Sequence, residues 1–440
     1  MAFLYSIFYT VITLGVLVFI HELGHFLAAK FSGMRVDTFS IGFPPRAFGK
    51  KIGETDYCIS WLPLGGYVKI AGIIDESFDT EFIDKPPEPW EFRSKSLTAR
   101  VFVLSAGVIM NIILAVVIFS AIQYTRGKYI EQTTEVGYVI EGSVAEQSGF
   151  KAGDNIVSIN GKPITHWSEV DEGLYLEDMG KEHQVVVNRN GQQERLELPA
   201  FTLTDSSRDG VGIVEAHMVP TIQGVEIGKP AEKAGLAPGD VIVAINAIQV
   251  HTDQEIIKVI HANPGKQISL QWKRHDSLHS GVATVSEAGR IGISIGRQYT
   301  GPSTHIQYSF VGAIGQGFRE VYKVVDLIVQ SIRNIIWGKA TVKESFGGPI
   351  RIAQMATQSA EYGFASFMTF MAMLSVSLAV LNILPIPALD GGHITMMLYE
   401  KVAGREIPVK VKMGIQKAGF VLLLAFMAFI IYNDLMSSVF

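Results

Sequence analysis

The sequence predicts a polytopic α-helical membrane protein with four transmembrane helices, a β-hairpin on the cytoplasmic side and two small α+β domains outside the membrane. Two observations carry this prediction: the apolar residues gather in four long runs, and the polar segment between the second and third runs repeats itself. Charged residues make up only 18% of the 440 residues, against about 25% in soluble domains. The net charge of -5 disfavours a nucleic-acid binder.

Each apolar run is long enough to cross a bilayer core, which takes about 20 helical residues. The runs predict spans over about 4–29, 101–124, 362–384 and 413–433. A cleavable signal peptide is the alternative for the first run. That alternative requires a basic start, and no Lys or Arg precedes His21.

The flanking Lys and Arg residues predict the orientation of the spans, because cytoplasmic loops are enriched in them. Both basic loops lie on one side of a four-span protein, and their basic residues are Lys30, Arg35, Arg93, Lys95, Arg100, Lys401, Arg405, Lys410 and Lys412. We therefore expect both termini and the long segment 125–361 to lie outside the cytoplasm.

The long segment contains a ten-residue pattern twice, at 145–154 and at 231–240, with an offset of 86 residues. A repeat of this kind predicts two copies of a small domain. The pattern A-E-x-x-G-[FL]-x-x-G-D, followed by an apolar strand, resembles bacterial PDZ domains, which bind extended peptides at a sheet edge. Two β-rich spacer domains without a ligand are the alternative.

Two further segments connect these parts. The apolar residues of 321–336 recur at helical spacing and predict an amphipathic helix, which could lie on the membrane surface or pack under the second repeat. Residues 34–70 alternate between apolar and polar side chains and predict hairpin strands. The acidic, proline-rich residues 75–91 predict a solvated loop.

The pattern H-E-x-x-H occupies residues 21–25, inside the first predicted span. Residues i and i+4 share one helix face, so His21 and His25 can bind one metal ion while Glu22 takes a proton from its water. Ionisable side chains within a span cost several kcal/mol and indicate function. The ligand types favour zinc, although other divalent metals fit the same set.

Zinc needs a third protein ligand, and Asp390 at the end of the third run is the best candidate. It follows Pro385 and Pro387, which break the helix at membrane depth, where irregular backbone survives only if it is buried or lines a cavity. With the predicted topology, both His21 and Asp390 lie towards the cytoplasmic side. A helix cap is the alternative role for Asp390, and His393 is the alternative ligand.

These motifs together resemble the site-2 protease family of intramembrane zinc metalloproteases: H-E-x-x-H in the first span, Leu389-Asp390-Gly391 after the third, and tandem PDZ-like domains between the second and third. Pro63–Lys69 resembles the end of that family's membrane-reentrant β-hairpin. Val108 stands where the family often has proline, which puts a local kink in doubt, and Pro44 replaces the usual glycine.

The resemblance implies eight segments. They are the first span with its H-E-x-x-H (1–30), the reentrant hairpin and loop (31–98), the second span (99–126), two PDZ-like domains (127–205 and 206–298), an amphipathic helix and linker (299–361), the third span with its Leu-Asp-Gly motif (362–393), and a cytoplasmic loop with the fourth span (394–440).

The resemblance also implies the chemistry. Zinc would be bound by His21, His25 and Asp390, with Glu22 as the general base. The substrate would be a single transmembrane helix, cut after local unwinding as the second step of regulated intramembrane proteolysis. Anti-sigma factors and remnant signal peptides are the implied substrates, and a bacterial inner membrane is the implied location.

Asn382, Pro385 and Pro387 would help to hold the substrate. The alternative for Asn382 is an interhelical hydrogen bond. For Asn111 in the second span, a structural role and a functional role both stay open.

Two other function classes remain open to test. A catalytically inactive membrane scaffold would bind through its PDZ-like domains, but it would be expected to have lost Glu22 or a metal ligand. A zinc carrier would usually show several sites or repeated membrane halves, and here the repeat lies in the soluble segment.

Overall fold

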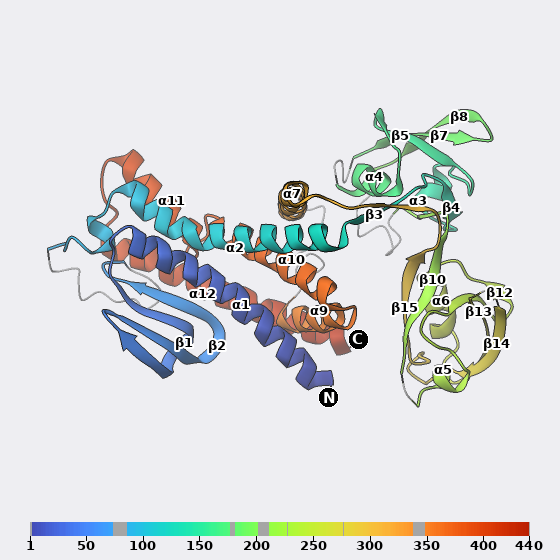
Figure 1. The fold of residues 1–440 in the computed structure, drawn as a ribbon, viewed down its shortest axis with the longest axis horizontal. Coiled ribbons are helices and arrows are strands. Elements are labelled where there is room, and N and C mark those ends of the chain that lie inside the picture. The colour runs from blue at the N-terminus through green and yellow to red at the C-terminus, as the bar shows by residue number, and fades with distance from the viewer. Residues whose placement is uncertain are drawn as a thin grey trace. The chain divides into compact units, whose positions relative to one another are not determined.

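The computed structural model describes residues 2–73, 86–176, 181–200, 211–226, 228–275, 277–337 and 348–439. These residues form two compact units, which Figure 1 shows as ribbons. The first unit joins Met1–Gly127 to Gln307–Phe440, and the second is Lys128–Ile306. Most of the acidic loop predicted at 75–91 lies outside the described residues.

Among the described residues, four helices of the first unit are long and apolar enough to cross a membrane, and they coincide with the four predicted spans. They are α1 (Ala2–Phe31), α2 (Leu97–Arg126), α10 (Phe364–Ile383) and α12 (Val409–Val439). Only 17% of the apolar window of α1 and 11% of that of α12 are buried in the protein. Their remaining apolar surface therefore suits contact with lipid.

The core of the helical unit lies where α1, α2 and α10 meet around Leu17, Ala115 and Val376. The predicted amphipathic helix is α7 (Phe310–Ile336). Its apolar side, around Val321, packs into this same core. The spans therefore cover its apolar side, a packing partner that neither of the two predicted positions, on the membrane surface or under the second repeat, had named.

Within the described residues, this unit also contains the shorter α-helices α9 and α11. The helix α9 (Pro349–Glu361) is capped at its N-terminus by a carboxylate of α12. Asp434 accepts hydrogen bonds from the backbone N–H groups of Gly348 (3.1 Å) and Ile350 (3.2 Å). The only acidic residue in the described part of α12 is thus an N-terminal cap for another helix. The helix α11 (Asp390–Ala403) follows α10 after a short irregular turn.

The predicted hairpin consists of β1 (Val36–Ile52) and β2 (Thr55–Ile70), and it contacts α1 (Figure 1). Both strands bend. The first part of β1, Val36–Ile41, pairs along one edge with Asp56–Ile59 and along the other with Gly66–Ile70. The last part, Arg46–Ile52, pairs with Thr55–Ser60. No other described strand pairs with the outer edge of Gly66–Ile70. This edge of the hairpin lies at the site described below.

The second unit contains both repeats. The first repeat is built from β3 (Lys128–Glu131), β4 (Val136–Val139), α3 (Val144–Gln147), β5 (Asn155–Ile159), β6 (Lys162–Pro163), α4 (Trp167–Asp171), β7 (His183–Arg189), β8 (Gln192–Leu198) and β9 (Ile213–Glu215). The second is built from β10 (Met218–Val225), α5 (Pro230–Lys233), β11 (Val241–Ile245), β12 (Ile248–Gln249), α6 (Asp253–His261), β13 (Gln267–Arg274), β14 (Ser277–Thr284) and β15 (Ile293–Tyr299); β16 (Ser303–Ile306) then pairs with β3.

Each repeat has its own apolar core. The first core includes Val211 and Ile213, which lie beyond the predicted boundary at residue 205, because β9 pairs with β4. In the second repeat the corresponding strand is β15, which pairs with β10.

The Asp of the Gly-Asp motif accepts hydrogen bonds from an Arg side chain and a backbone N–H in both copies of the repeat. Asp154 accepts hydrogen bonds from Arg189 (2.7 Å) and from the Lys151 N–H (2.8 Å). Asp240 accepts them from Arg274 (2.7 Å) and from the Ala237 N–H (2.8 Å). Both carboxylates are fully buried, so each needs these donors. Although burial alone would raise it, the pKa of Asp240 lies below its ordinary value because Arg274 and the Ala237 N–H stabilise the carboxylate.

Candidate active site

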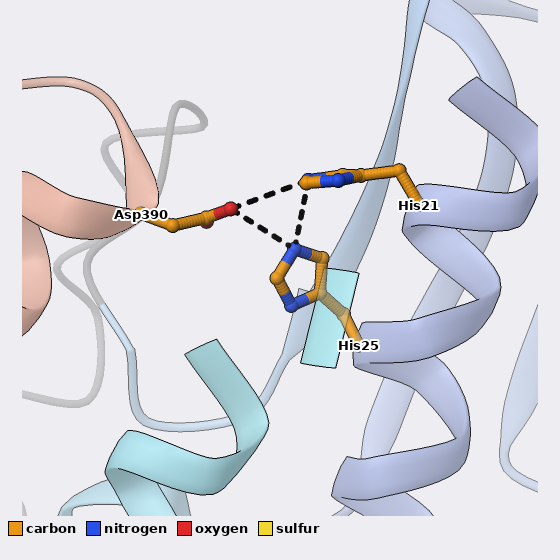
Figure 2. Close-up of side chains that lie close together, drawn as sticks. All are labelled: His21, His25 and Asp390. Atoms are coloured by element: carbon orange, nitrogen blue, oxygen red, sulfur yellow. Dashed lines mark hydrogen bonds and ion pairs between the residues drawn. The ribbon is translucent and has the colours of Figure 1, made fainter. Parts of the chain in front are cut away.

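Three side chains that are far apart in the sequence meet within the helical unit: His21 and His25 of α1, and Asp390 at the start of α11 (Figure 2). The Nε2 atoms of the two histidines are 3.0 Å apart. Asp390 Oδ2 lies 3.2 Å from Nε2 of His21 and 3.5 Å from Nε2 of His25.

These three distances fit a zinc ion. Zn–N and Zn–O bonds of about 2.0–2.1 Å at tetrahedral angles place neighbouring ligand atoms about 3.3–3.4 Å apart. The Asp390 Oδ2 atom is buried and accepts no hydrogen bond, which is costly for a carboxylate oxygen that has no cation. Among the described residues, this is the one group of three or more His, Cys, Asp or Glu side chains positioned to share an ion.

The helix α2 supports both imidazoles from behind. His25 Nδ1 lies 2.8 Å from the carbonyl oxygen of Val103, and His21 Nδ1 lies 3.4 Å from the amide of Asn111. Gly107 lies on α2 between Val103 and Asn111, one helical turn from each. A Cβ added at Gly107 would lie 2.5 Å from His25 Nε2 and 2.6 Å from His21 Cε1. The two helices therefore run antiparallel, and a glycine allows them to approach closely at the site.

The backbone before Asp390 is irregular, as the two prolines predicted. Ala388 has a φ of +74°, an uncommon conformation for a residue other than glycine. A Cβ at Gly391 would clash with the carbonyl of Ile383, so the start of α11 packs directly on the end of α10. The N-cap residue of α11 is Leu389, and Asp390 Oδ2 accepts no hydrogen bond from the helix, which disfavours the capping role.

A cavity of about 90 Å³ adjoins the three side chains. Glu22 lines it, together with Gly66, Tyr67 and Val68 of the hairpin. His393 also lines it, but its ring lies 3.0 Å from Gln416 Nε2 and is not part of the three-residue group. The geometry therefore favours Asp390 over His393 as the third ligand.

The other predicted residues lie apart from this cavity. Asn382 is half-buried on the last turn of α10, and Pro385 and Pro387 follow in the turn to α11. None of the three is among the residues that line the cavity. Sequence reasoning missed the supporting role of Gly107, although small residues in apolar spans are a known signal of close helix packing.

Comparisons with known proteins agree with one another. The model of the family described as Peptidase family M50 matches residues 9–426. The "Regulator of sigma E protease" of Haemophilus influenzae is 30% identical, with 99% of both chains covered, and "Protease RseP" of Yersinia pestis is 28% identical with the same coverage. A Neisseria meningitidis protein that carries a zinc metalloprotease name is 30% identical over 95% of this chain and 96% of its own. A solved PDZ domain from Listeria monocytogenes covers 18% of this chain and 86% of its own at 24% identity with a TM-score of 0.17, a likeness too weak to argue from.

Proposed function

The chain belongs to peptidase family M50 and is a metalloprotease of the site-2 type, and on this premise we propose that His21, His25 and Asp390 bind its zinc ion and that Glu22 is its general base. The observation that supports this assignment best is the convergence of three ligand atoms within 3.0–3.5 Å of one another, two of them on α1, a helix that can span a membrane. An ion-free cluster of this kind would be expensive at membrane depth.

Bound zinc would polarise the scissile carbonyl and acidify a water molecule. The chain's own residues then do the rest. Glu22 lines the cavity and is one residue from His21, so its carboxylate can accept the proton of the attacking water and deliver it to the leaving amine. The Val103 carbonyl holds the His25 ring in place.

The hairpin is proposed to hold the substrate, and to re-enter the membrane in order to do so. Gly66–Val68 line the cavity, and Gly66–Ile70 forms one edge of the two-stranded sheet of β1 and β2. A substrate helix that unwinds locally exposes N–H and C=O groups, and adding it to this edge would satisfy them. Asn382, Pro385 and Pro387 are proposed to contact the substrate further along its length, because they lie beside the irregular turn that leads to Asp390.

The topology and the relatives' names suggest the biological role. The basic loops favour a cytoplasmic position for the hairpin and an outer position for both termini and the two PDZ-like domains. These domains are proposed to exclude membrane proteins that keep a bulky external domain. The proposed substrates are anti-sigma factors and remnant signal peptides in a bacterial inner membrane, and relatives that carry the name "Regulator of sigma E protease" support a role in the sigma-E pathway.

The test is cleavage of a tagged single-span substrate without its external domain by the parent protein and by Glu22→Gln. We expect the parent to cut and the variant to keep its zinc but lose cleavage, because the amide cannot accept the proton. If both proteins bind zinc and leave several such substrates intact, the inactive scaffold becomes the better account.

A further inference from the structure

Asn111 is a fully buried polar residue in the middle of α2, a span that is otherwise apolar around it. Its side-chain nitrogen lies 3.4 Å from Nδ1 of His21, and its side-chain oxygen has no hydrogen-bond partner. A buried amide with an unsatisfied oxygen costs about 1–3 kcal/mol, so its presence in a membrane span requires a reason.

Helix packing does not supply that reason. The contact between α2 and α10 at this level is a hydrogen bond from the Ser375 hydroxyl to the backbone carbonyl of Asn111, 2.8 Å long. Any residue at position 111 provides that carbonyl. Among the described residues, the only hydrogen-bonding contact of the Asn111 side chain is with His21.

The positions of the ring nitrogens of the two histidines show that His21 needs a hydrogen-bond acceptor at Nδ1. A carbonyl oxygen only accepts hydrogen bonds, so His25 Nδ1, 2.8 Å from the Val103 oxygen, carries the hydrogen and Nε2 keeps its lone pair. His21 Nε2 faces the same point in space as His25 Nε2. Its Nδ1 must therefore also carry a hydrogen, and that hydrogen needs an acceptor.

We propose that Asn111 is the positioning residue for His21: its amide oxygen accepts a hydrogen bond from Nδ1–H and fixes the Nε2 lone pair towards the metal. Rotation of the amide by 180° exchanges its oxygen and nitrogen. In the orientation described, the amide oxygen has no hydrogen-bond donor. After the rotation, this oxygen faces the Nδ1–H group of His21 and accepts its hydrogen bond. This inference rests on the proposed metal site.

The register of the two helices supports this assignment. His21 and His25 are four residues apart on α1, while Val103, Gly107 and Asn111 are spaced by four on α2. Because the helices are antiparallel, Val103 faces the second histidine and Asn111 faces the first, with Gly107 making room for both rings. Each imidazole thus has one acceptor behind it, and partners of this kind orient metal-binding histidines.

The test compares three variants of the full-length protein in detergent: Asn111→Leu, which has a similar size and no acceptor; Asn111→Asp, which keeps an acceptor oxygen and has no N–H donor; and Ser375→Ala, which removes the neighbouring interhelical hydrogen bond. Two readouts do not depend on cleavage: zinc affinity by competition with a chelator, and the visible absorption spectrum of the Co²⁺-substituted protein, which reports the ligand geometry.

We expect zinc affinity to fall about 10- to 100-fold in Asn111→Leu, the usual effect of losing such a partner, and the Co²⁺ spectrum to change. Asn111→Asp should stay close to the parent in both, and Ser375→Ala should leave both unchanged even if it lowers the melting temperature. The inference is overturned if Asn111→Leu binds zinc as the parent does, or if Asn111→Asp is as impaired as Asn111→Leu. Failure of the metal site itself has a different signature, since His21→Ala would then bind zinc like the parent.

Discussion

Gly107→Ala is the sharpest single-atom perturbation that the structure offers at the site. The added methyl would lie 2.5 Å from His25 Nε2, 2.6 Å from His21 Cε1 and 2.8 Å from His21 Nδ1. Non-bonded heavy atoms prefer about 3.5 Å or more, so the overlap is about 1 Å on both rings at once. Moving one ring would not relieve the overlap, because the new methyl group also contacts the other ring.

The consequence follows from the tolerance of metal sites. Ligand distances in real sites stay within about 0.2 Å of their ideal values, and a shift of about 1 Å in a reacting group costs about 100-fold in rate. We therefore expect Gly107→Ala to lose cleavage by about 100-fold or more, together with most of its zinc, measured as metal content after gel filtration and as initial cleavage rate.

The matched control is Gly15→Ala on α1. A Cβ at Gly15 meets no atom within 4 Å, and alanine is the better helix former by about 1 kcal/mol. This control should keep full zinc content and activity. A Gly107→Ala protein that binds zinc and cuts like the parent would refute the packing argument, since the two rings would then have room that the structure does not give them.

Three further predictions concern other parts of the chain. Gly66→Ala would bring a methyl within 3.0 Å of Glu22 Cγ and 2.9 Å of the Ser40 oxygen, so cleavage should fall about 10-fold or more while zinc content stays at the parent level; joint loss of zinc would contradict this reasoning. Asp240→Ala removes the buried acceptor of Arg274 and of the Ala237 N–H and should destabilise the second repeat by about 1.5–3 kcal/mol, the cost of losing hydrogen bonds to a charged group; hydrogen exchange should rise there and not in the first repeat, and Asp154→Ala should do the reverse. Burial, with the charges of Glu131 and Asp171, raises the pKa of Glu215 from 4.5 to about 8. The folded state therefore holds this proton more tightly than the unfolded state, and its stabilising effect, complete below about pH 4.5, is lost as the pH rises towards 8. Glu215→Gln should remove that loss, so the melting temperature should fall between pH 5 and 8.5 more steeply in the parent than in the variant. An equal change with pH in the two proteins would show that the pKa of Glu215 is ordinary.

The spans could be predicted from sequence because they depend on composition alone: any helix of about 20 apolar residues meets the requirement of the bilayer. The hairpin and the repeats were predictable from local alternation and from self-similarity. The pairing of β9 with β4 was not, because a strand of three residues carries too little pattern to show which repeat it completes. The position of α7 was not predictable either, because a hydrophobic face by itself does not say what covers it.

The site shows the same division between what is local and what depends on register. The two histidines and Glu22 stand out because they are ionisable groups inside an apolar run, which needs no knowledge of neighbours. Asn111 is noticeable as a polar residue in an apolar run, but its role could not be assigned, because that role depends on which turn of α2 faces which turn of α1. Hydropathy locates a span to within several residues, and an error of four residues would move Asn111 from His21 to His25 or beyond the site. Once the antiparallel register is known, the spacing of four in both helices becomes meaningful: a glycine must lie between the two supporting acceptors, since any side chain there would occupy the space of the rings. The pairing of H-x-x-x-H in the first span with a glycine four residues before an amide in the second is thus a geometric requirement that two antiparallel helices impose on each other.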